Sequence, residues 1–177
     1  MKLRRFLPFA SAGLLLSGIC LYGQATAGFQ GEVLAEVNAL EKKIVGLAEA
    51  TPEDKYSWRP GTGVRSVSEV FVHIANANFN IPRSLGVQPP DGLPKDAEKT
   101  VTGKAQVVAL LKQSFEHLRG AGKTHASEPE KLVTRGKREV STRSVFVGAS
   151  GHMHEHLGQL IAYSRVNGVK PPWAAER

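Results

Sequence analysis

The segment 142–167 constrains the fold most, because it carries an apolar stripe at helical spacing that includes two histidines. Each residue turns about 100° around a helix axis, so His152 and His156 lie about 40° apart on one face, and His154 lies about 200° from His152. The stripe contains Val145, Ala149, His152, His156, Leu160 and Tyr163. This pattern predicts a helix that packs against a core and directs two imidazoles into it.

Three further segments show apolar residues at steps of three and four, and they predict helices over roughly 30–50, 66–79 and 103–121. Ser66 and Glu69 have the spacing of a capping box at the start of the second helix. With 41% hydrophobic residues, the composition is typical of a globular protein. We therefore predict an all-α fold, a four-helix bundle with one core.

The connections between these helices are long for a minimal bundle. Residues 83–102 are rich in proline and glycine and are expected to form a structureless loop that covers one end of the bundle. Residues 122–141 are charged and are expected to be irregular. We expect Thr142 or Ser144 to cap the last helix, and Gly168 to follow its end.

Two imidazoles in a core would be costly without partners, and a divalent metal is an economical partner for neutral imidazole. The third ligand is expected to be His73, which lies on the apolar stripe of the second predicted helix. In a metal site, the nitrogens of His73, His152 and His156 should converge to within about 3–5 Å. The alternative is that His73 is a core histidine bonded to a backbone carbonyl. His117 and His125 are expected to be exposed.

Several motifs occur together in a characteristic order. They are His73 on the second helix, the run from His152 to Gln159, Tyr163-Ser164-Arg165, the Gly168 to Pro172 segment, and the upstream Trp58-Arg59-Pro60. In this order the chain resembles the DinB/YfiT-like superfamily over roughly residues 29–173. The resemblance implies a four-helix bundle of the DinB/YfiT type with a histidine triad as its metal-binding site. The implied metal ligands are His73, His152 and His156.

Nitrogen ligands suit zinc, nickel, copper and iron and disfavour magnesium and calcium, so zinc and nickel are the leading candidates for the divalent metal. The open coordination positions can hold water or a thiolate and lower its pKa. Glu155 lies on the flank of the ligand face, where it is a candidate general base, although an exposed side chain is the simpler expectation. Gln159 is expected to make a hydrogen bond between helices, and Trp58 to pack across the end of the bundle or line the mouth of the site.

The N-terminus has the features of a signal peptide. Lys2, Arg4 and Arg5 form a basic segment, residues 6–22 are mostly apolar, and Ala25-Thr26-Ala27 matches an A-x-A cleavage site. We therefore predict a leader over 1–27 and a DinB-like domain over 28–177. The mature protein would be periplasmic or secreted, with no stable membrane insertion after cleavage. An uncleaved anchor is the alternative.

Cys20 is the only cysteine and lies inside the predicted leader. A lipidated Cys20 is a further alternative to simple cleavage. Cleavage would leave a mature chain without cysteine, which excludes disulfides, a cysteine nucleophile and a thiolate ligand from the protein.

The formal net charge is +7, but three of the basic residues lie in the predicted leader, so the mature domain is only mildly basic. Its one dense basic run is Arg135-Gly136-Lys137-Arg138, which is short for a nucleic-acid-binding surface. We expect a small-molecule substrate and no nucleic acid as partners. A homodimer remains open from the sequence.

DinB-like proteins include thiol-dependent S-transferases and isomerases that use low-molecular-weight thiols. With the implied metal site, the resemblance is consistent with a metal-dependent transferase or hydrolase. The thiols of such transferases are cytoplasmic, whereas this chain is predicted to be exported, which favours hydrolysis or binding without turnover. Two other functions stay open: a non-catalytic module that binds a metal or small ligand, and a plain bundle whose histidines are packed or hydrogen-bonded.

Overall fold

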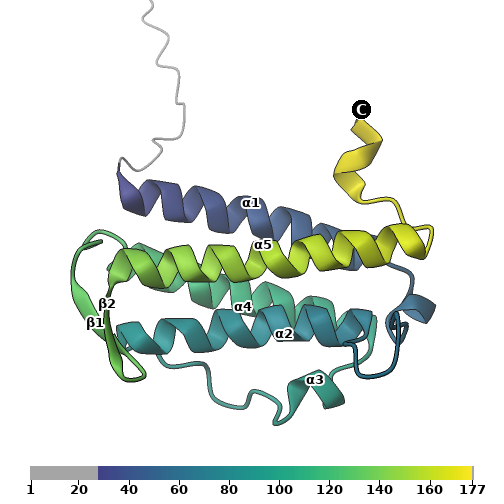
Figure 1. Ribbon diagram of the computed structural model, residues 1–177, viewed down its shortest axis with the longest axis horizontal. Coiled ribbons are helices and arrows are strands. Elements are labelled where there is room, and N and C mark those ends of the chain that lie inside the picture. The colour runs from purple at the N-terminus through teal and green to yellow at the C-terminus, as the bar shows by residue number, and fades with distance from the viewer. Residues whose placement is uncertain (1–27, 177) are drawn as a thin grey trace, which may run out of the picture.

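A computed structural model describes residues 28–176, so the predicted leader, its cleavage site and Cys20 lie outside the described residues. Four long helices make up most of this part: α1 (Phe29–Ala50), α2 (Val67–Asn80), α4 (Lys104–His125) and α5 (Thr142–Val166). They run alongside one another, as Figure 1 shows. The predicted all-α four-helix bundle is confirmed. In the described part of the chain, no helix has the length and apolar character needed to cross a bilayer.

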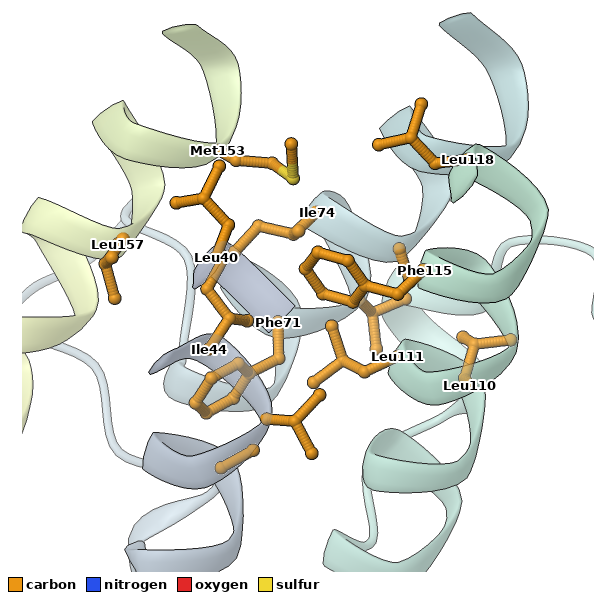
Figure 2. Close-up of a cluster of buried hydrophobic side chains, with 14 of the residues drawn as sticks. Leu40, Ile44, Phe71, Ile74, Leu110, Leu111, Phe115, Leu118, Met153 and Leu157 are labelled. Atoms are coloured by element: carbon orange, nitrogen blue, oxygen red, sulfur yellow. The ribbon is translucent and has the colours of Figure 1, made fainter. Parts of the chain in front are cut away.

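The four long helices form a closed arrangement in which each packs against two others. Helix α4 contacts α1 and α2, and α5 contacts the same two helices from the other side. All four contribute side chains to one core, part of which Figure 2 shows. The labelled core side chains are Leu40, Ile44, Phe71, Ile74, Leu110, Leu111, Phe115, Leu118, Met153 and Leu157. Each fully buried side chain of this kind contributes about 1.5–3 kcal/mol of hydrophobic stabilisation.

The start of α2 is fixed by the predicted capping box. The backbone N–H of Glu69 donates to Ser66 Oγ at 3.3 Å, and the backbone N–H of Ser66 donates to Glu69 Oε2 at 2.6 Å. Two otherwise unpaired helix-end donors are thereby satisfied. The cap sets where α2 begins, and His73 follows on its second turn.

The connection over 83–102 is more ordered than expected. Its first residues belong to a 3₁₀ turn, η2 (Ile81–Leu85), and it contains the four-residue helix α3 (Ala97–Thr100), which packs against α2. Ala97 and Val101 are buried and hold this short helix on the bundle. The expectation of a structureless loop was therefore wrong. Only one buried residue lies at each end of α3, so the sequence of this segment has no apolar periodicity that would predict a helix.

The second long connection also differs from the expectation of irregular structure. Helix α4 continues to His125, and the strands β1 (Leu132–Arg135) and β2 (Arg138–Ser141) form an antiparallel hairpin. Gly136 adopts a positive φ of 64° at the turn, a conformation that glycine takes without a steric penalty. These four-residue strands are mostly exposed and lack the alternation that would have indicated them.

Two shorter segments complete the described chain: η1 (Glu53–Lys55) after α1, and η3 (Pro172–Glu176) at the end. Helix α5 is capped by Ser141, whose Oγ accepts from the backbone N–H of Ser144 at 3.2 Å. The predicted caps, Thr142 and Ser144, already lie inside the helix, because β2 leads directly into α5. Gly168 follows the helix with a φ of 72°, as expected for a residue past a helix end.

Candidate metal centre

His73, His152 and His156 lie together between α2 and α5. One ring nitrogen from each lies within 4.8 Å of the others, so the predicted convergence is confirmed. The ring centroids are 4.5–5.0 Å apart. The two helices pack side by side, and the residues one turn apart on α5 face His73 on α2. Three imidazoles in this arrangement could hold a divalent metal ion.

The cluster is buried on one side and open on the other. His156 is 9% exposed, whereas the His73 side chain is 25% exposed and His152 is half-buried. A site of this kind is shielded by the bundle but accessible to solvent at the His73 edge. It therefore suits a ligand that approaches from outside, which a fully enclosed structural site would not.

Hydrogen bonds fix the protonation of two of the three rings. His73 Nδ1 lies 2.8 Å from Glu98 Oε1, and His156 Nδ1 lies 3.0 Å from Gln159 Oε1. Since both oxygens accept, each Nδ1 carries the proton and each Nε2 keeps a free lone pair. Gln159 is itself oriented, because its amide Nε2 donates to the Tyr163 hydroxyl at 2.8 Å.

The third ring, His152, has its Nε2 3.1 Å from His73 Nε2. Two nitrogens bound to one tetrahedral zinc at about 2.05 Å would lie about 3.3 Å apart, so this spacing fits a shared ion. The Nδ1 of His152 is buried and has no hydrogen-bond partner among the described residues. The donor chemistry and the spacing of the nitrogens fit a site for a divalent metal.

The protonation state of the cluster also suits a metal. Burial lowers the pKa of His152 to about 4, with a further contribution from the charges of His156 and His73. His152 is therefore neutral at neutral pH, which is the form that binds metal. Burial alone would raise the pKa of Glu98, but the hydrogen bonds from Arg65 and His73 lower it below its ordinary value. Glu98 is thus an ionised acceptor.

The sequence matches the model of a known protein family. The model of the DinB superfamily matches residues 37–160. The chain belongs to the DinB superfamily. No curated protein matches the sequence.

Solved structures of DinB-like proteins share the fold. A DinB-like protein from Bacillus subtilis aligns with a TM-score of 0.62 at 18% identity, covering 78% of this chain and 93% of that one. A second, from Bacillus cereus ATCC 10987, aligns with a TM-score of 0.68 at 14% identity, covering 82% and 98%. Identities this low establish a common architecture for the DinB bundle and no shared reaction.

Two neighbours of the metal-binding candidates on α5, His154 and Glu155, lie outside the histidine cluster of this DinB-superfamily protein. His154 is on the opposite face of α5, as predicted, where its Nε2 lies 2.6 Å from Glu36 Oε1. Glu155 is exposed and makes no hydrogen bond to the three histidines within the described chain. Its charge nevertheless raises the pKa of His152, after the larger, lowering effects of burial and the two neighbouring histidines. It therefore lies at the rim of the site.

Three expectations about surrounding residues had different outcomes. Trp58 packs edge-on against Tyr163, with ring centroids 5.3 Å apart, which confirms the packing expectation. Gln159 does not join two helices, because both of its partners lie on α5, three residues before it and four after. His117 is half-buried instead of exposed, since its ring packs 5.6 Å from that of Phe79.

Sequence reasoning missed Glu98, the carboxylate that holds His73. It lies 25 residues further along the chain, in the connection that was expected to be structureless. No periodicity or motif marks it, because its role depends on where α3 folds back against α2. The only related prediction was that this connection covers one end of the bundle.

In the metal-free protein, we expect the free energy of unfolding to fall as the pH is lowered from about 6.5 towards about 4. Unfolded chains take up a proton on His152 near its ordinary pKa of 6.5, but the folded protein does so only near 4. The unfolded state therefore binds more protons in this window, and acid favours it. Urea denaturation between about pH 7 and pH 5 measures the effect, above the range in which carboxylates titrate.

The control for this pH dependence is His152→Asn, which removes the titrating ring. Its stability should change less over the same pH range than that of the wild-type protein. Equal slopes in the two proteins would contradict the expectation.

Proposed function

We propose that this protein is a metal-dependent enzyme in which His73, His152 and His156 bind one divalent ion, with zinc or nickel as the leading metals. The supporting observation is the convergence of three ring nitrogens within 4.8 Å at a partly exposed site. Three neutral ligands leave the ion its full charge, and the open edge leaves room for a small-molecule substrate.

When bound, the ion would lower the pKa of a coordinated water or thiol and polarise a carbonyl. The chain's own residues would orient the three imidazoles and exclude solvent on the His156 side, where the bundle buries the ring. Glu155, which is exposed and influences His152 through its charge, would serve as the general base that accepts a proton from a water at the ion. The reaction class is a transferase or hydrolase.

We rank hydrolysis first because the proposal includes export of the protein through cleavage after Ala27, away from cytoplasmic thiols. Mass analysis of exported protein that begins at Gly28 is the expected result. Protein that begins at Met1, or one that carries a lipid on Cys20, would contradict this part of the proposal and leave the metal site unaffected.

The experiment uses protein purified without a histidine tag. Metal content is measured by mass spectrometry, and turnover is then assayed on activated esters and on thiol–electrophile pairs, with zinc or nickel supplied. We expect one metal per chain and turnover of at least one ester, with the activity lost in His156→Ala and kept in His154→Ala. Bound metal with no turnover on either panel would favour a non-catalytic binding module. Protein without metal would favour a plain bundle.

A further inference from the structure

We infer that Glu98 is a positioning residue of the metal centre, which acts through His73. This inference rests on the proposed metal site. Glu98 Oε1 lies 2.8 Å from His73 Nδ1, on the side of the ring away from Nε2, the nitrogen that faces His152. A carboxylate in this position fixes the ring plane and the tautomer, and it increases the electron density available at the ligating nitrogen.

The carboxylate is itself held at both oxygens. Glu98 Oε2 accepts from Arg65 Nε at 2.8 Å, while Oε1 is used by His73. Arg65 immediately precedes Ser66, the cap of α2, so the chain of contacts runs from the start of α2 to His73 on the same helix. The backbone of α3 is anchored beside Glu98, because Ala97 is only 6% exposed. Glu98 is therefore rigidly placed, although it lies in a connection between helices.

The three histidines differ in the partner of the nitrogen that does not face the cluster. His73 has a carboxylate, His156 has the neutral amide of Gln159, and His152 Nδ1 has no partner among the described residues. His73 also comes from a different helix from the other two and lies at the more exposed edge. A carboxylate is a stronger acceptor than a neutral amide, so loss of Glu98 should weaken the centre more than loss of Gln159.

The test is the affinity for Zn²⁺ and Co²⁺, measured by competition with a chelator. Glu98→Gln keeps the size of the side chain and removes its charge, and it should weaken binding by about 10–100-fold. Arg65→Ala should weaken binding less, because Glu98 remains but loses its anchor. The matched control is Glu116→Gln, which neutralises an exposed carboxylate on α4 without a hydrogen bond to any of the three histidines in the described chain, and it should change the affinity by less than about threefold.

A second measurement shows whether Glu98 orients the His73 ring or only attaches α3 to the bundle. Nitrogen NMR of the metal-free protein reports the tautomer of the His73 ring. We expect the proton on Nδ1 in the wild-type protein and in Glu116→Gln, and a shift towards the Nε2–H tautomer in Glu98→Ala. The visible spectrum of the Co²⁺ protein should change in Glu98→Gln and stay unchanged in Glu116→Gln.

Two outcomes are distinguishable. If the wild-type protein binds metal and Glu98→Gln binds it equally well with the same Co²⁺ spectrum, the inference is wrong and Glu98 only attaches α3 to the bundle. If the wild-type protein binds no metal, the proposed function is wrong and the inference falls with it.

Discussion

Replacing His156 with Ala should abolish stoichiometric metal binding, and His152→Ala should do the same. Each variant removes one of three nitrogen ligands, and two ligands hold a divalent ion far more weakly than three. Mutating a residue that is only hydrogen-bonded to a metal ligand typically weakens metal affinity by about 10–100-fold, so removing a ligand itself should weaken the affinity more. Metal content of the purified variants, together with calorimetric titration of Zn²⁺ or Ni²⁺ into metal-free protein, measures the effect.

His154→Ala is the matched control, since it removes an imidazole from the same turn of α5. His154 faces away from the cluster and contacts Glu36, so this variant should retain the metal. If His154→Ala abolished binding while His156→Ala did not, the proposed three-histidine centre would be wrong. Circular dichroism of each variant would show that the bundle remains folded.

Removing the metal should lower the melting temperature substantially. A metal that binds only the folded state adds about 4 kcal/mol of stability when its free concentration is 1,000 times its dissociation constant. For a domain of this size, 1 kcal/mol shifts the melting temperature by roughly 2–4 °C, so the expected decrease is about 8–16 °C. The physical reason is that the ion would join α2 to α5, and unfolding would have to release it. Thermal unfolding with and without a chelator measures the difference.

The control is His156→Ala, which should melt at the same temperature with and without the chelator. It should also melt below the metal-loaded wild-type protein. A wild-type protein whose melting temperature does not respond to chelator or to added metal would contradict the prediction.

The four long helices, and the face of the last helix on which each histidine lies, could be predicted from local patterns of residues. Apolar residues at steps of three and four locate a helix and its buried face, because both properties follow from local backbone geometry. The same geometry separates His152 and His156 from His154. The capping box of Ser66 and Glu69 is equally local, since its two partners are three residues apart. These features are readable without knowledge of the rest of the fold.

The residues that support the histidines could not be predicted in this way, because they are brought together by tertiary packing. Glu98 reaches His73 because α3 packs on α2, and this packing depends on a few buried contacts in a connection without a repeating pattern. Gln159 bonds along its own helix because His156 and Tyr163 both present groups to it there. The hairpin over β1 and β2 likewise depends on where the ends of α4 and α5 lie. Contacts between irregular segments are set by the packing of the whole chain, so no local pattern in the sequence specifies them.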